Sequence, residues 1–199
     1  MSSRSSMKLF DLKQSSNRSV VWVMAVTLLA LVLGWLLWYS VSARTNVVEH
    51  GGVKAGFPVG WLVQKGIAGE QMVFSGSNPL DPTLRYVVNL LPSGEAIHFS
   101  DLVFNRNLQR GQTLDSYVVL DQSEVKFNGK KAFRVHFAYV MNYGNEMLPQ
   151  VIEGVDYYWL TLPNAMVITL EERTDLYEQA VPRFNSFVSS VVYTPGGEK

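Results

Sequence analysis

The chain has 199 residues, with 17 Lys and Arg against 17 Asp and Glu, and 47% of its side chains are hydrophobic. The zero formal charge argues against a nucleic-acid-binding protein, which normally carries an excess of basic residues. Because the chain has no cysteine, disulfides, thiolate metal sites, cysteine nucleophiles and lipidated cysteine anchors are excluded. The length suits one domain, and the most informative feature is a sharp change in composition after the first 43 residues.

Residues 20–43 form a continuous apolar segment, with no charged side chain between Arg18 and Arg44. A helix of about 20 residues spans the roughly 30 Å hydrocarbon core of a bilayer, and it satisfies its own backbone hydrogen bonds in lipid. Aromatic residues favour the headgroup region, and they lie near both ends of the segment: Trp22, and Trp35, Trp38 and Tyr39. We therefore predict a single transmembrane helix over residues 20–43.

The charges that flank this segment predict its orientation. Of the 17 basic and 17 acidic residues, four basic and one acidic lie in residues 1–19, which leaves 13 basic and 16 acidic residues beyond. The positive-inside rule then places residues 1–19 in the cytoplasm, as a serine-rich, disordered basic tail. We expect a single-pass protein of the cell membrane, with its C-terminal domain on the extracytoplasmic side.

A cleaved secretory signal is the alternative, because Val41-Ser42-Ala43 resembles a cleavage site. The apolar core of such a signal usually has about 7–15 residues, so the length of this segment favours a retained anchor. Within the segment, Ala30 and Gly34 form a small-xxx-small pair that would let a neighbouring helix approach closely. Such a pair also arises by chance in apolar helices, and that interpretation is the simpler one.

After a connector at residues 44–52, we expect one extracytoplasmic domain over residues 53–194 and a short tail at 195–199. Apolar or alternating segments between turn residues are typical of strands, and they lie at residues 53–57, 61–65, 70–74, 84–91, 123–127, 131–141, 154–162 and 165–171. Asn128-Gly129 is a strong hairpin signal, and Pro163-Asn164 marks a second hairpin. In residues 131–141 the large apolar side chains alternate, which predicts one apolar face: Phe133, Val135, Phe137 and Tyr139.

Two regions of the domain are predicted to be helical. The first helix covers residues 101–109, with Ser100 as its N-cap, Gly111 as its stop and a further turn at 113–119. Near the C-terminus we predict a short helix from about residue 174 and a second one that begins at Pro182. Strands, a helix, hairpins and a terminal helix in this order predict an α+β sandwich with a mostly antiparallel sheet.

Several short motifs follow one another along the domain. They are a Pro-x-Gly-Trp turn, a Leu-x-x-Tyr element, a hairpin around Asn-Gly, an aromatic run and a terminal Pro-x-Phe helix, at residues 57–61, 113–117, 125–132, 156–159 and 180–184 with Ser189-Ser190. In this order they resemble the PsbP/Mog1-like family over nearly all of residues 53–194, although the transmembrane helix is not part of the family's common domain. The resemblance implies a PsbP/Mog1-like α/β sandwich, and a scaffolding, stabilising or assembly role.

Groups that carry out catalysis are sparse in this chain. The three histidines lie far apart, without other ligands at the usual metal spacing: His50, His98 and His136. No nucleophile elbow, P-loop, dinucleotide fingerprint or HExxH motif is present. The acidic cluster at residues 171–175 is interpreted as a solvated turn rather than a cation site, and Arg106 and Arg110 as exposed charges on one helix face. We therefore expect no catalytic residue, no metal and no cofactor.

Aromatic residues gather in the predicted hairpins, on a sheet that we expect to have one uncovered face. Because aromatic residues are enriched at protein interfaces, four tyrosines are candidates for contact with a partner: Tyr139, Tyr143, Tyr157 and Tyr158. The competing interpretation is that Trp159 and one of its two tyrosine neighbours pack in the core, as strand alternation requires.

The sequence thus predicts a non-enzymatic accessory, scaffolding or assembly subunit that docks at the outer face of a larger membrane protein complex. The alternative is a membrane-tethered module that binds a lipid or small apolar ligand between the sheet and the helices. We expect the lipid bilayer and a protein complex as partners, and no nucleic acid.

Overall fold

The computed structural model describes residues 7–42, 45–67, 71–92, 98–127, 129–142, 148–161 and 163–195. They fall into two compact units, divided after Arg44. The first unit contains the helix α1 (Met7–Ser42), and the second contains two helices and ten strands among the described residues.

Helix α1 has 36 residues and includes residues 20–42 of the predicted span, whose last residue, Ala43, lies outside the described residues. Its segment Val20–Leu37 has a mean hydropathy of 2.6, and none of it is buried in the protein. The helix begins at Met7, so residues 7–19, which were predicted to be a disordered tail, are helical. Extending an existing helix costs far less than nucleating one, which explains why a polar segment continues the apolar helix.

The domain is built on a seven-stranded sheet with the order β3-β4-β5-β9-β8-β7-β6, in which all neighbours are antiparallel. A smaller antiparallel sheet has the order β1-β2-β10. The strand bounds are β1 Thr45–His50, β2 Val53–Pro58, β3 Leu62–Lys65, β4 Met72–Asn78, β5 Asp81–Pro92, β6 Asp115–Phe127, β7 Lys130–Met141, β8 Gln150–Thr161, β9 Asn164–Arg173 and β10 Val192–Tyr193.

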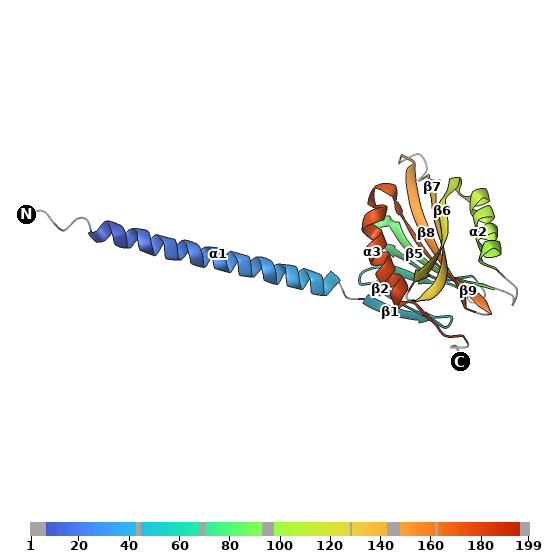
Figure 1. Ribbon diagram of the computed structural model, residues 1–199, viewed down its shortest axis with the longest axis horizontal. Coiled ribbons are helices and arrows are strands. Elements are labelled where there is room, and N and C mark those ends of the chain that lie inside the picture. The colour runs from blue at the N-terminus through green and yellow to red at the C-terminus, as the bar shows by residue number, and fades with distance from the viewer. Residues whose placement is uncertain are drawn as a thin grey trace, which may run out of the picture. The chain divides into compact units, whose positions relative to one another are not determined.

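The large sheet lies between the helices α2 (Phe99–Thr113) and α3 (Thr174–Ser190), one on each face (Figure 1). The alternation predicted in β7 is confirmed, since Val135 packs in a core cluster with Leu102 and Val103 of α2, whereas Ala132 packs in the cluster of α3. The α3 face is the larger core and includes Phe57, Tyr86, Ile168, Leu170, Phe184 and Phe187. The domain is therefore an α+β sandwich with a mostly antiparallel sheet, as predicted.

Both predicted hairpins are confirmed. Strands β6 and β7 pair up to Phe127 opposite Lys130, and Gly129 has a φ of +77°, a conformation that glycine adopts without strain. Asn128 lies outside the described residues. Strands β8 and β9 pair up to Thr161 opposite Asn164, around the turn at Pro163.

Three local predictions are wrong at the start of an element. Residues 45–50, predicted as part of a connector, form β1 because they pair along all of β2. Helix α2 starts two residues earlier, with His98 at its N-cap, and continues past Gly111 to Thr113. The further turn predicted at residues 113–119 is instead the start of β6, where Ser116 takes a φ of +54° and the register with β7 shifts, which hides the strand alternation.

The two predicted C-terminal helices are one helix, α3, with Pro182 inside it. A proline in a helix interior removes a backbone hydrogen bond and costs about 3 kcal/mol. The buried stripe of α3 runs without a break across that position: Tyr177, Ala180, Phe184, Phe187 and Val188. Burying side chains of this size contributes about 1.5–3 kcal/mol each, so the stripe outweighs the lost hydrogen bond.

Candidate functional site

A buried ion pair lies between α2 and the sheet. The guanidinium of Arg110 donates to both oxygens of the Asp156 carboxylate, with an Nη1–Oδ2 distance of 2.6 Å and an Nη2–Oδ1 distance of 3.1 Å. Asp156 also accepts hydrogen bonds from Thr169 Oγ1 at 2.6 Å and Tyr158 Oη at 3.0 Å. Nε of Arg106 lies 3.4 Å from the same carboxylate. All four partners satisfy a side chain that is completely buried.

Each member of this ion pair keeps the other in its charged form. Burial alone would raise the pKa of Asp156, but the guanidinium groups of Arg110 and Arg106 outweigh it and lower that pKa below its usual value. Burial would likewise lower the pKa of Arg110, and the Asp156 carboxylate outweighs that effect. The guanidinium carbon of Arg110 also lies 4.0 Å from the ring centre of Phe137. Both oxygens of Asp156 are bonded inside the fold, and the pair fastens α2 to the sheet.

The two arginines were predicted to be exposed, and that prediction is wrong for both: Arg110 is buried, and the side chain of Arg106 is only 17% exposed. The burial of Arg110 could not be predicted from the helix alone, because its partner Asp156 is 46 residues away in sequence. A signal did exist in the strand: Asp156 is a charged residue inside the apolar run of residues 154–162. A charge at a buried strand position requires a partner.

Helix α2 presents apolar side chains outward as well as inward. Phe104 is 66% exposed and Leu108 is 51% exposed, and residues four apart in a helix share a face. Beside them a groove of about 840 Å³ runs between α2 and strands β6 and β7, lined by apolar rings and by Glu124 and Gln122. We call Phe104, Leu108 and this groove the α2 surface. It borders β6, the last strand of the sheet.

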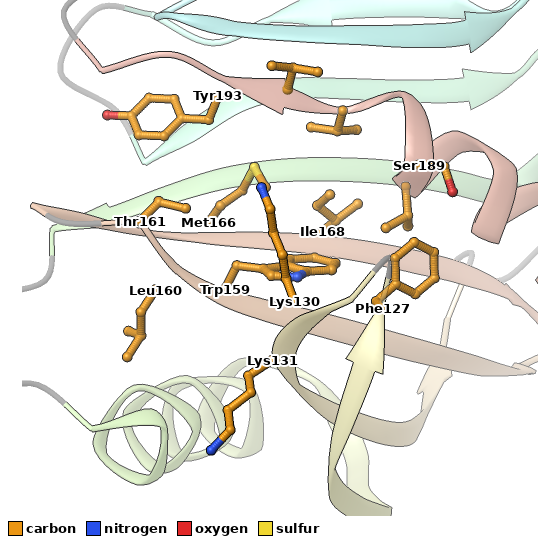
Figure 2. Close-up of a pocket in the computed structure, with 13 residues that line it drawn as sticks. Phe127, Lys130, Lys131, Trp159, Leu160, Thr161, Met166, Ile168, Ser189 and Tyr193 are labelled. Atoms are coloured by element: carbon orange, nitrogen blue, oxygen red, sulfur yellow. The ribbon is translucent and has the colours of Figure 1, made fainter.

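A second groove, of about 640 Å³, lies on the opposite face of the sheet (Figure 2). Its walls come from the end of α3 and β10, from β8 and β9, and from the tip of the β6–β7 hairpin. We call it the C-terminal groove, and its lining includes Phe127, Lys130, Lys131, Trp159, Met166, Ile168 and Tyr193. It shares no residue with the groove at α2.

The tyrosines predicted to contact a partner do not lie on an open face. Tyr139, Tyr157 and Tyr158 are all buried, with exposures of 4%, 9% and 0%, and Tyr143 lies outside the described residues. Tyr157 packs on the α3 side and Tyr158 on the α2 side. The sheet was expected to have an uncovered face, but a helix covers each face, so both neighbouring rings are enclosed.

The other predicted contact residues lie on α1. Ala30 and Gly34 are exposed, and no atom lies within 4 Å of the position that a Cβ of Gly34 would take. A contact with another helix at these two residues stays a prediction.

The histidines occupy three separate places. His136 Nε2 lies 2.7 Å from Glu153 Oε1, and its ring stacks on Tyr177. His50 contacts the carbonyl oxygen of Gly66 at 3.0 Å, and His98 begins α2. Within the described ranges, no group of three or more His, Asp or Glu side chains is arranged to hold a metal ion.

The acidic cluster at residues 171–175 is not a solvated turn throughout. Glu171 and Glu172 are buried in β9, where Glu171 pairs with Arg85 at 2.9 Å and Glu172 accepts from Thr83 Oγ1 at 2.8 Å. Burial raises the pKa of Glu172. The strand continues two residues past the predicted end, and its pairing with β8 carries these carboxylates into the fold.

No family model matches the sequence, and no curated protein matches it. Among solved structures, the cyanobacterial PsbP protein (CyanoP) of Synechocystis sp. PCC 6803 is similar, with a TM-score of 0.57 and 10% identity over 76% of this chain and 94% of that one. The Ran-binding protein Mog1p of Saccharomyces cerevisiae has a TM-score of 0.47 and 12% identity over 75% and 96% of the two chains. LpqN of Mycobacterium tuberculosis, described as involved in cell envelope biogenesis, has a TM-score of 0.48 and 15% identity over 76% and 91%.

The similarity to CyanoP shows a shared fold, and at 10% identity it carries no function with it. The domain that follows α1 has the PsbP/Mog1-like fold that the motifs of the sequence predicted.

Proposed function

We propose that this chain is a membrane-anchored, non-enzymatic accessory subunit, which docks through its α2 surface onto a larger membrane protein complex at the outer face of the cell membrane. The observation that carries the proposal is the outward apolar face of α2, with Phe104 and Leu108 both more than half exposed beside a groove. Aromatic residues are enriched in protein interfaces and are frequent among their strongest contacts.

The edge of the sheet adds to this surface. Strand β6 has 13 residues and pairs only with β7 among the described strands, so its outer edge is open to a partner. An open edge strand offers backbone donors and acceptors that an added strand can satisfy. The partner we propose is therefore a protein segment with apolar side chains that lies over α2 and along β6.

The anchor supports the same function. Segment Val20–Leu37 is long and apolar enough to cross a bilayer and is not buried in the protein. Holding a domain at a membrane raises its effective concentration near a membrane-bound partner, so a modest docking surface suffices.

The chemistry of the described residues also favours docking over catalysis. The buried carboxylates are occupied by partners within the fold, as Asp156 is by Arg110 and Glu171 is by Arg85. A non-catalytic role agrees with the function that the motifs imply, although the fold alone does not establish it.

The first prediction tests the α2 surface by co-purification. The full-length chain is tagged, expressed in its native membranes and extracted in mild detergent, either unchanged or as the double variant Phe104→Glu/Leu108→Glu. Because hot-spot contacts are worth about 2 kcal/mol or more, we expect the variant to recover a co-purifying complex roughly thirtyfold less well than the unchanged chain.

The matched control is Leu80→Glu, since Leu80 is 94% exposed and lies in the turn between β4 and β5. It should recover the complex in full. Equal recovery of the complex with the double variant would show that the α2 surface does not bind it. A version in which α1 is replaced by poly-Leu tests whether the helix itself, including Ala30 and Gly34, contributes to recognition.

A further inference from the structure

The C-terminal groove has an apolar floor. Trp159, Met166 and Ile168 form it from the neighbouring strands β8 and β9 (Figure 2). Val188 of α3 also belongs to the lining. Its volume of about 640 Å³ falls within the range of about 300–1,000 Å³ that is usual for ligand pockets. Methionine adapts its shape easily to a neighbouring apolar group. The floor therefore suits a flexible hydrocarbon chain.

The mouth of this groove is positively charged. Its lining residues include Lys130 and no acidic residue. Lys130 has no ion-pair partner within the described part of the chain. Its ammonium group is therefore available to an anionic group bound at the mouth.

A hydrogen-bond donor completes the rim. The hydroxyl oxygen of Tyr193 accepts a hydrogen bond from Asn164 Nδ2 at 2.8 Å. Because that oxygen is engaged as an acceptor, its own proton remains to be donated to a ligand. Lys130 extends across the groove in Figure 2, whereas Lys131 points away from it, so Lys130 and Tyr193 are the polar groups closest to a bound head group.

We propose that the C-terminal groove binds a long-chain fatty acid anion. The hydrocarbon chain lies along Trp159, Met166 and Ile168, and the carboxylate lies at the mouth between Lys130 and Tyr193. Charge complementarity selects this ligand, because Lys130, with no acidic neighbour in the lining, favours an anion next to an apolar floor. The site goes beyond the docking function and uses a different face of the domain.

Photo-crosslinking tests this proposal on the full-length chain. The protein is reconstituted in phosphatidylcholine nanodiscs, incubated with a palmitic acid analogue that carries a diazirine in its chain, irradiated and analysed by peptide mass spectrometry. We expect labels on residues that line the groove, among them Phe127, Met166 and Val192. The variant Lys130→Gln should lower this labelling roughly tenfold, because it removes a charge-assisted contact.

Three comparisons make the result decisive. Lys65→Gln, at the opposite edge of the sheet, should label like the unchanged chain. Ser189→Trp adds a large side chain at an exposed position of the lining and should block labelling, with circular dichroism to show that the fold is kept. Phe104→Glu/Leu108→Glu should leave labelling unchanged, so that this proposal and the docking proposal fail separately.

The corresponding fatty alcohol, with the same chain and diazirine, tests the anion. It should label the groove at least roughly tenfold less than the acid does. Equal labelling by acid and alcohol would overturn the proposal, and so would labels confined to peptides of α1, which would show partition into the bilayer only. Unchanged labelling in both the lysine variant and Ser189→Trp would also overturn it.

Discussion

Asp156 is a carboxylate with no exposure to solvent and four partners. Breaking a buried ion pair from one side leaves an uncompensated charge, which costs about 3–5 kcal/mol. We therefore expect Asp156→Asn to lower the free energy of unfolding of the domain by about that amount, as measured by urea denaturation. Asp121→Asn is the control, because Asp121 pairs with Arg134 at the exposed surface, and it should leave the midpoint unchanged. A similar small effect for both would show that the buried pair does not hold α2.

The same carboxylate makes stability depend on pH. The folded state lowers the pKa of Asp156, whereas an unfolded aspartate has a pKa of about 3.9. Its contribution is therefore fully present above pH 4 or so and is lost as the pH falls through the lowered folded value. We expect the unfolding free energy of the unchanged chain to decline more steeply below about pH 4 than that of Asp156→Asn. Parallel curves between pH 2 and 7 would contradict this assignment.

At the scale of single elements, two glycines test two different effects. Gly154 tests close packing in a strand, and Gly111 tests helix propensity. A Cβ on Gly154 in β8 would lie 2.7 Å from the carbonyl oxygen of Leu170 and would also meet the ring of Phe137. Gly111 in α2 has no atom within 4 Å of that position. We expect Gly154→Ala to destabilise the domain by about 1–3 kcal/mol through overpacking, and Gly111→Ala to stabilise it by about 0.5–1 kcal/mol. The measurement is the thermal unfolding midpoint of each variant. Midpoints that change equally and in the same direction would contradict the prediction.

At the scale of the whole chain, the proposal requires that α1 is retained as an anchor. We expect protein purified from membranes to have the intact mass of 22.4 kDa, and a tag at the N-terminus to resist protease added from the extracytoplasmic side. The domain of residues 45–199 should be digested under the same conditions. A mature chain that begins at Arg44 would instead identify the segment as a cleaved signal, since the Val41-Ser42-Ala43 site would then be used.

The features that could be predicted from the sequence are those with local causes. The span of residues 20–37 depends only on a continuous run of apolar residues, and both hairpins depend on turn residues next to their strands. The alternation in β7 follows from the two-residue repeat of any strand. Short motifs in order were also enough to predict the PsbP/Mog1-like fold, because each marks one turn or helix of it.

The candidate sites depended on segments that are distant in sequence, and only the tertiary structure decided them. Helices cover both faces of the sheet, so Tyr139, Tyr157 and Tyr158, which looked available for contact, are core residues. Phe104 and Leu108 form an exposed apolar surface instead. The pairing of Arg110 with Asp156 and the C-terminal groove likewise join different elements. The sequence by itself determined the long apolar helix, most of the strands and the fold class, because neighbouring residues decide them. Burial and charge pairing depend on which elements pack together, and that is a property of the complete fold.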